Sequence, residues 1–280
     1  MQTIDTSPQC RVLFPDTNEV RFCVVGCGGT GSAVAHHLAA LMFDLESRGV
    51  TTSMLLIDHD TVEAKNVGRQ RFAPYDVGHN KAVVLAQRLT AFYGVTVSAL
   101  PLGVPDAWAH VRDTPTIVVG CVDGDARRHI AEYVMRRNRV WWIDSGNDRF
   151  SGQVLVGNAI NGEPPDPFGL VNWLPLPSVQ LPGLLEADTA AVSADPLDCA
   201  LAAALGEQSL FVNTAMATVV AQFAYDITVR HQLDAMGAYV SLVPLAIRPI
   251  PITGIRLIEL GFRATRAHPM AMERENANTN

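Results

Sequence analysis

Cysteine is scarce in this sequence, and its spacing is uninformative. The chain has five cysteines in 280 residues, an odd number, and no two of them form a Cys-x-x-Cys pair. Structural zinc sites commonly use such pairs, and disulfide-rich secreted domains contain more cysteine in less chain. We therefore expect reduced thiols, no zinc and a cytoplasmic protein.

Long apolar runs and basic clusters are missing as well. Glycine, proline or a charged residue interrupts every apolar run, so none is long enough for a transmembrane helix. The N-terminal MQTIDTSPQC has neither the basic start nor the apolar stretch of a signal peptide. The net charge is −7 and the pI is near 5.6, which argues against nucleic acid or an anionic membrane as a partner.

The sequence does have enough hydrophobic residues for a large core. Hydrophobic residues make up 48% of the chain and charged residues 18%, and the length suits one α/β domain. Short apolar strands alternate with helical patterns as far as Asp144. Because these strands are apolar throughout, we predict a Rossmann-like, mostly parallel sheet with helices on both faces. The strands are expected at 21–25, 53–57, 95–100, 116–121 and 140–144, and the helices at 33–49, 78–93 and 126–138.

The second half of the chain is less regular. Residues 157–198 contain much of the proline and little periodicity, which predicts a long loop or crossover. A helical pattern returns over 199–233, and 238–260 reads as antiparallel edge strands with proline at the turns. The predicted organisation is an N-terminal segment 1–20, one domain over 21–262, and a disordered tail over 263–280.

A glycine-rich loop follows the first predicted strand. Residues 26–32 read GCGGTGS and open a helix, which is the context that a nucleotide-binding glycine motif needs. The helix N-terminus offers unpaired N–H groups to phosphate, and Asp58, ending the next strand, can accept hydrogen bonds from ribose. A glycine turn that serves packing alone is the less favoured alternative. The loop does not distinguish ATP from NAD. The glycines assigned to the nucleotide are Gly26, Gly28, Gly29 and Gly31.

The stretch that follows Asp58 is rich in polar residues. Arg69 could bind phosphate oxygens with its forked guanidinium, and Lys81 could reach them as a point charge. Lys81 begins a predicted helix, where a cation opposes the macrodipole and gains no helix stability. A site that breaks a triphosphate needs such cations, because negative charge moves onto the departing pyrophosphate.

An acidic residue follows a later apolar strand. Asp123 comes just after the strand ending in Cys121, at the edge of the sheet where such folds bind ligands, and its carboxylate could hold Mg²⁺. Each residue also has an ordinary interpretation: Arg69 as a surface cation, Lys81 as a solvated helix residue, and Asp123 as a helix N-cap. Asp60 and Asp125 would then be turn or cap residues. Their joint occurrence at strand ends favours a site.

Taken together, these residues resemble the ThiF/MoeB/ubiquitin-activating superfamily of ATP-dependent adenylyltransferases. The resemblance is carried by GCGGTGS (26–32), DHDTVEAKNVGRQ (58–70), Lys81, DGDARR (123–128) and GQV (152–154). It implies that Asp58 binds ribose, that Asn66, Arg69 and Lys81 bind phosphates, and that Asp123 binds Mg²⁺. Asp60 falls within the same cofactor-binding stretch, and Gln70 would support the others.

The resemblance also implies a reaction and its partners. The expected activity is adenylation of the C-terminal carboxylate of a small ubiquitin-like, β-grasp carrier protein by ATP, in a symmetric homodimer. The size, the missing zinc cysteines and the C-terminal layout are most similar to the ThiF-related member of the bacterial PRTRC cassette. The sequence departs from the family pattern at Gly124, where relatives usually have Asn, and at Lys65, where Ser is frequent. Arg11 is a weak candidate for an arginine donated across the dimer.

Three alternatives stay open at this point. Cys199 could receive the activated carrier as a thioester, although a lone Cys among Ala and Leu is more often a core residue. A non-catalytic nucleotide-binding partner subunit would keep the fold without the chemistry. An NAD-dependent oxidoreductase would use Asp58 and the glycine loop, but it would leave Arg69 and Lys81 unexplained.

Overall fold

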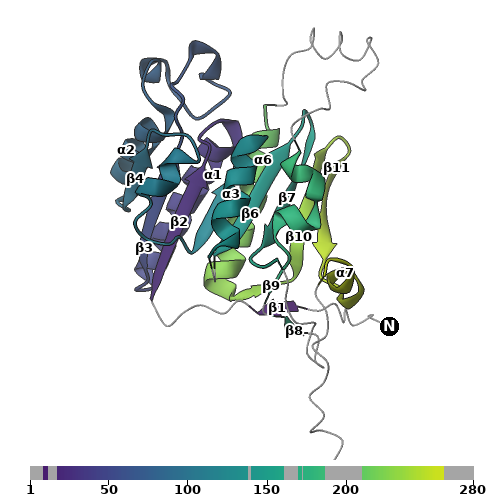
Figure 1. The fold of residues 1–280 in the computed structure, drawn as a ribbon. Helices are drawn as coiled ribbons and strands as arrows, with labels where there is room; N and C mark the ends of the chain where they lie inside the picture. Colours follow the sequence, from purple (N-terminus) through teal and green to yellow (C-terminus); the bar gives the residue numbers. More distant parts are fainter. Residues whose placement is uncertain are drawn as a thin grey trace, which may run out of the picture.

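The computed structural model describes residues 9–11, 18–137, 140–160, 170–171, 173–186 and 210–261. Within them, eight strands form one sheet in the order β11-β10-β7-β6-β5-β2-β3-β4 (Figure 1). Strands β2 to β6 are parallel to one another, whereas β7, β10 and β11 add antiparallel pairs. This confirms the predicted fold class. The strands are β2 (Glu19–Val25), β3 (Thr51–Ile57), β4 (Val97–Leu100), β5 (Ile117–Gly120), β6 (Trp141–Asn147), β7 (Ser151–Gly157), β10 (Ala235–Leu242) and β11 (Leu245–Pro251).

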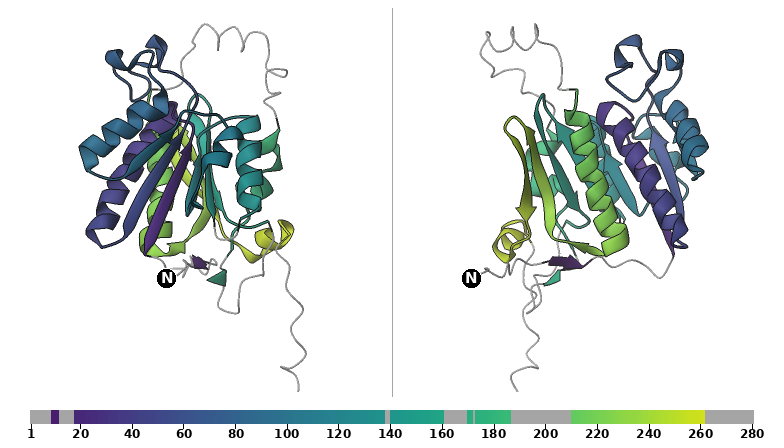
Figure 2. Two further views of the ribbon diagram at one scale, coloured as in Figure 1. Left: turned by 60° about the vertical axis from the view of Figure 1, so that its left-hand side comes forward. Right: turned by 180° about the vertical axis from the view of Figure 1, so that it is seen from behind.

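Helices cover both faces of the sheet. One face carries α1 and α6, which pack against each other, and the opposite face carries α3 (Figure 2). The main helices are α1 (Gly29–Ser47), α2 (Lys81–Tyr93), α3 (Asp125–Met135) and α6 (Val212–Tyr225). The short ones are η1 (Ala64–Asn66), η2 (Pro74–Asp76), η3 (Asp106–His110), α4 (Pro177–Gln180), η4 (Pro182–Leu185), the π-helical η6 (Asp226–Arg230) and α7 (Gly254–Glu259).

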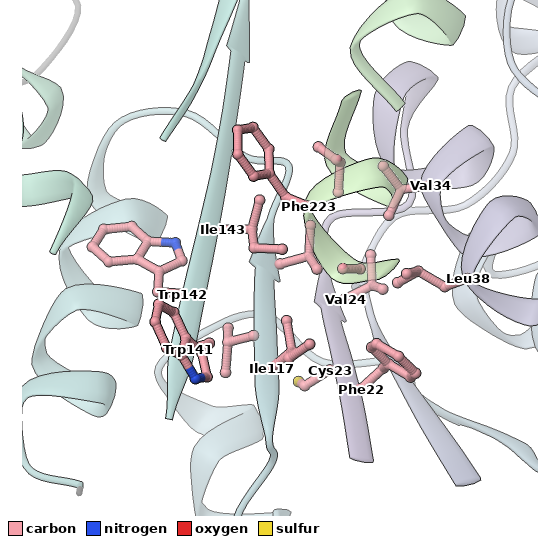
Figure 3. Packing of buried hydrophobic residues seen from close by; sticks show 14 of the residues in the cluster. Phe22, Cys23, Val24, Val34, Leu38, Ile117, Trp141, Trp142, Ile143 and Phe223 are labelled. Atoms are coloured by element: carbon pink, nitrogen blue, oxygen red, sulfur yellow. The ribbon is translucent and has the colours of Figure 1, made fainter. Parts of the chain in front are cut away.

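The core lies between the central strands and these helices. All four residues of β5 are buried, as expected for a strand covered on both faces. Phe223 of α6 approaches Ile143 of β6, and Leu38 of α1 lies beside Val24 of β2 (Figure 3). This packing fixes the carboxyl ends of β2, β3, β5 and β6 at one edge of the sheet, where the polar residues of interest follow.

A second, small sheet joins segments that the sequence pattern left separate. Its order is β8-β1-β9, with β1 (Gln9–Arg11) parallel to β8 (Leu170–Val171) and antiparallel to β9 (Gln232–Leu233). Arg11 therefore lies in a strand rather than in an unattached segment. Strand β9 also shows that the helix predicted as far as residue 233 ends too late. The helical segment continues through η6 and ends at His231, which has a left-handed backbone conformation.

Several other boundaries differ from the prediction, two of them because a side chain caps a helix. Helix α2 begins at Lys81 rather than at residue 78, because the Asn80 side chain caps it by accepting from the Val83 N–H. Residues 254–259 are helical rather than extended, because the Thr253 hydroxyl accepts from the Arg256 N–H and caps α7. The 157–198 stretch is not wholly irregular, since α4 and η4 lie within it.

Cys199 and the expected tail, residues 263–280, fall outside the described residues. Among the helices that are described, none combines the length and hydropathy needed to cross a membrane.

Candidate nucleotide-binding site

The glycine loop is tightly packed between β2, β5 and the start of α1. Gly26 has φ +88°, and a Cβ built there would lie 2.5 Å from the Cys121 carbonyl oxygen. A Cβ on Gly31 would overlap the Gly26 carbonyl oxygen. The N-cap residue, Gly28, makes no side-chain cap, and the first turn contains no acidic residue. The first N–H groups of α1 are therefore available to an anion.

Asp58 ties the end of β3 to this loop. Its two carboxylate oxygens accept from the N–H of Cys27 at 2.6 Å and of Asp60 at 2.8 Å. The residue is 9% exposed. A carboxylate can accept about four hydrogen bonds, so Asp58 keeps capacity for a ribose hydroxyl.

Lys81 is buried at the start of α2 and paired with Asp60. Its Nζ donates to Asp60 Oδ2 at 2.9 Å, and its side chain is 8% exposed. The hydrogen bond from Lys81 lowers the pKa of the Asp60 carboxyl group, although partial burial opposes the change. The Asn80 amide donates to the carbonyl oxygens of Asp58 and Asp60, which fixes this turn. The interpretation of Lys81 as a solvated helix residue is therefore wrong.

Asn66 and Gln70 shape the loop between these elements. Asn66 is buried, and its Oδ1 accepts from the Glu63 N–H at 2.8 Å while its carbonyl accepts from the Gln70 N–H at 2.9 Å. The Gln70 amide reaches the glycine loop, because a Cβ built on Gly28 would lie 4.0 Å from Gln70 Nε2. Among the described residues, Gln70 Oε1 is buried and has no hydrogen-bond partner.

Arg69 and Asp123 are exposed. The Arg69 backbone N–H donates to the Asn66 carbonyl at 3.3 Å, but no hydrogen bond or ion pair joins the Arg69 guanidinium to the described part of the chain. Asp123 has a side chain that is 79% exposed and lies 3.7 Å from Arg127 Nη2. Gly124, with φ +55°, is the N-cap residue of α3, so the interpretation of Asp123 as the N-cap is wrong. Asp125 begins α3 and pairs with Arg128 at 2.8 Å.

Two groups offer carboxylates to a divalent cation. Asp58, His59 and Asp60 place one ligand atom each within 4.8 Å of one another. However, the Lys81 ammonium on Asp60 would repel a cation there. Asp123 presents an exposed carboxylate at the carboxyl edge of β5, and oxygen ligands of this kind suit Mg²⁺. Asp123 also has a cation beside it, but Arg127 lies 3.7 Å away and makes no hydrogen bond to it, so Asp123 fits a magnesium ion better.

A buried ion pair that was not predicted from the sequence lies beside this edge. Arg127 Nε donates to Asp144 Oδ1 at 3.2 Å, and Asp144 is fully buried. Burial raises the pKa of Asp144 to about 7, although Arg127 opposes the shift. An acid inside the apolar strand 140–144 was a usable signal, because a buried carboxylate needs a partner.

A second missed cluster joins α1, β6 and α6. The Thr30 hydroxyl lies 3.0 Å from Asn147 Oδ1 and 2.9 Å from Asn213 Oδ1. Gly29 has no room for a side chain, since a Cβ there would collide with the Asn213 amide. Asn213 comes from the last main helix, so local sequence patterns carried no signal for this contact. The cluster anchors the start of α1.

Two cysteines lie beside the nucleotide loops, Cys27 buried and Cys121 half-buried. Burial raises the pKa of Cys27 and of Cys121, and nearby negative charge from Asp58 and Asp144, respectively, adds to the effect. A thiol with a raised pKa is a poor nucleophile at neutral pH. Both thiols are therefore suited to packing rather than to nucleophilic chemistry.

The fold and this edge together define a Rossmann-like protein with a glycine-loop nucleotide site at the carboxyl ends of parallel strands. The model of the ThiF family matches residues 15–228, and the chain belongs to that family. Among curated proteins, the chain is 24% identical over 182 residues to ubiquitin-like modifier-activating enzyme 5 of Oryza sativa subsp. japonica, which is 55% of this chain. It is 23% identical over 185 residues to the Arabidopsis thaliana enzyme of the same name.

Solved structures share the fold. The chain superposes on E. coli MccB with ATP with a TM-score of 0.54 at 18% identity, covering 84% of this chain and 64% of that one. PaaA superposes with a TM-score of 0.56 at 17% identity, with the same coverages of 84% and 64%. The alignments to the two plant enzymes span 41% of each enzyme.

Proposed function

We propose that this protein uses ATP to adenylate the C-terminal carboxylate of a small ubiquitin-like, β-grasp carrier protein. Membership of the ThiF family and similarity to activating enzymes support an adenylyltransferase-type activity. The carrier is the proposed part, because the chain matches only part of the length of these relatives. The narrower similarity to the PRTRC member is likewise a prediction.

The observation that carries the proposal is the arrangement of charge at the nucleotide edge. Asp58 is fixed on the glycine loop, Lys81 is buried at the start of α2, and Arg69 is exposed without a partner among the described residues. Asp58 would hold the nucleoside. The cations would then face the triphosphate, where charge develops as the bond breaks.

In the proposed reaction, one carboxylate oxygen of the carrier attacks the α-phosphorus of ATP. The new bond makes a mixed anhydride, the carrier acyl-adenylate, while the bond from the α-phosphorus to the bridging oxygen breaks and pyrophosphate leaves. Arg69 and Lys81 would stabilise the charge that moves onto pyrophosphate. Asp123 would hold Mg²⁺, which neutralises phosphate charge when bound.

A groove beside this edge offers a path for the carrier tail. It measures about 400 Å³ and lies over β7, β10 and β11, with Gln153, Tyr239, Ser241 and Arg248 in its lining. Gln153 of β7 pairs with Gly146, which lies near the carboxyl end of β6. The groove therefore borders a strand whose end forms part of the nucleotide edge. MccB has also been solved together with MccA, which supports a place for a second molecule in this fold.

Two further features of the proposed enzyme follow from the same reasoning. A homodimer would bury apolar side chains of the β10–β11 hairpin, where Val243, Leu245 and Ile247 are 69%, 81% and 62% exposed. Cys199 could take the activated carrier as a thioester, in which case Cys199→Ala would abolish transfer and leave adenylation intact.

The proposal is tested by exchange of labelled pyrophosphate into ATP, with Mg²⁺ and a panel of small β-grasp proteins ending in glycine. Arg69→Ala should lower exchange roughly a hundredfold, while ATP affinity changes much less, because the charge that it meets develops in the transition state. Lys65→Ala is the matched control, since Lys65 is an exposed cation of the same loop that pairs with Glu63. It should exchange like the wild type.

The alternatives predict other results. Tight NADH binding, seen by fluorescence, with no exchange for any carrier would favour an oxidoreductase and overturn the proposal. A non-catalytic partner subunit would bind ATP without exchange. The pairing of Lys81 with Asp60 favours this second candidate, because it already neutralises one of the two cations.

A further inference from the structure

A buried ion pair lies directly beneath Asp123. Arg127 of α3 has a side chain that is 9% exposed and is bonded to the fully buried Asp144 of β6. The sheet leaves space for this pair at two glycines. A Cβ on Gly146 would lie 2.5 Å from Arg127 Nη2, and one on Gly120 would lie 3.0 Å from Asp144 Oδ1. Strands β5 and β6 are thus shaped around the pair.

The bond between Arg127 and Asp144 does not use all of their polar atoms. Among the described residues, Arg127 Nη2 and Asp144 Oδ2 are buried without hydrogen-bond partners. Burying two charges is costly, and replacing such a pair with apolar residues is often neutral for stability, so stability alone explains it poorly. The unpaired Nη2 does have a neighbour of opposite charge. Asp123 Oδ1 is 3.7 Å away, in reach of an ion pair but beyond a hydrogen bond.

We propose that Arg127 is a positioning residue, anchored by Asp144, that holds the Asp123 carboxylate toward the nucleotide. The inference rests on the proposed function for the role given to Asp123. Attraction to Arg127 draws Oδ1 of a carboxylate that is otherwise 79% exposed, which leaves Oδ2 available to a divalent cation. Residues that orient a metal ligand in this way typically change metal affinity or activity 10- to 100-fold when they are replaced.

The test measures Mn²⁺ bound in the presence of ATP, by electron paramagnetic resonance, so it needs no carrier protein. Arg127→Met alone would leave Asp144 buried and unpaired, which is strongly destabilising, so the pair is replaced as a whole. The double variant Arg127→Met/Asp144→Val replaces the whole pair with apolar side chains. We expect it to fold with an unfolding midpoint close to the wild type, and to bind Mn²⁺ with ATP at least tenfold more weakly.

Two further variants separate positioning from general effects. Arg128→Met removes the neighbouring arginine, which is 49% exposed and pairs with Asp125, and should leave Mn²⁺ affinity unchanged. Adding Asp123→Asn to the double variant should weaken Mn²⁺ binding by a smaller factor than Asp123→Asn does in the wild type, because both changes act on one interaction. Mn²⁺ affinity at the wild-type level in the double variant, or additive losses, would overturn the inference.

Failure of the proposed function would look different. If the wild type binds Mn²⁺ with ATP through Asp123 and Arg127 but exchanges no pyrophosphate, the adenylation proposal fails and the positioning role stands. If Asp123→Asn leaves Mn²⁺ binding intact, Asp123 holds no metal and the positioning role falls, whatever the exchange assay shows.

Discussion

The two sides of the nucleotide edge differ in how firmly the protein holds their side chains. One side, formed by Asp58, Asp60, Asn80 and Lys81, is a closed network in which every member contacts another member. We call it the closed side. The other side, formed by Arg69 and Asp123, is exposed. Within the described chain its one ion pair joins Asp123 to Arg127 at 3.7 Å. We call it the open side.

The difference suggests that the two sides contribute differently, the closed side to both stability and ligand binding and the open side to activity alone. A closed network with a buried lysine sets the shape of the loop between β3 and α2, so its residues contribute to stability as well as to a ligand site. The exposed residues add little to folding, since exposed charges contribute little to stability. Substitutions on the closed side should therefore affect folding and activity together, and those on the open side should affect activity alone.

The largest effect is expected where the closed side meets the glycine loop. Gly31→Ala places a methyl group on the Gly26 carbonyl oxygen, a backbone atom that cannot move without shifting β2 against α1. We expect a loss of about 3 kcal/mol or more in unfolding free energy, or no folded protein. Chemical denaturation measures it.

Gly254→Ala is the control for that change. Gly254 begins α7, and a Cβ there meets nothing within 4 Å. Its stability should stay within about 0.5 kcal/mol of the wild type. Wild-type stability for Gly31→Ala would show that the loop relaxes more readily than its packing suggests.

A smaller effect should distinguish Lys81 from Arg69. Lys81→Met removes the hydrogen bond to Asp60 and leaves that carboxylate, 52% exposed, to water, so we expect a loss of about 1–2 kcal/mol. Arg69→Ala should change the unfolding free energy by less than about 0.5 kcal/mol. Urea denaturation of the two variants compares them directly, and equal losses would contradict the division into a closed and an open side.

The sequence predicted the central strands well, because apolar runs such as 116–121 are covered on both faces and have no other explanation. It did not predict the β8-β1-β9 sheet, since pairing between Cys10 and Leu233 depends on a contact over most of the chain. Helix α7 was missed for a related reason. Its six residues are too few to show a helical period, and its cap at Thr253 decides the conformation.

For the site, spacing identified the residues but not their contacts. The motif placed Asp58, Asp60 and Lys81 at neighbouring strand and helix ends, and the structure brings them together there. That Lys81 is held by Asp60, and that Asn66 braces its own loop, depend on side-chain directions that the motif does not specify. The roles assigned to these residues toward ATP stay predictions.

The smallest predicted effect concerns acid sensitivity on the α1 face next to the closed side. Burial lowers the pKa of His36 to about 4, with help from Arg71 and Arg88, and the pKa of His37 is lowered in the same direction. The folded state therefore binds fewer protons than the unfolded state between about pH 6.5 and 4. Stability from neutral His36 is present above pH 6.5 and is lost as the pH falls toward 4.

His36→Gln removes this titration. Between pH 7.5 and 5 the wild type should lose about 1 kcal/mol more unfolding free energy than the variant, a value reduced because His36 is in partial contact with solvent. Urea denaturation at the two pH values gives this difference. The two proteins need not be equally stable at pH 7.5, because the comparison is between their changes in unfolding free energy with pH. Arg69→Ala, on the open side, should keep the wild-type slope. Parallel slopes for His36→Gln and the wild type would show that protonated His36 is accommodated without loss, and that acid sensitivity arises elsewhere.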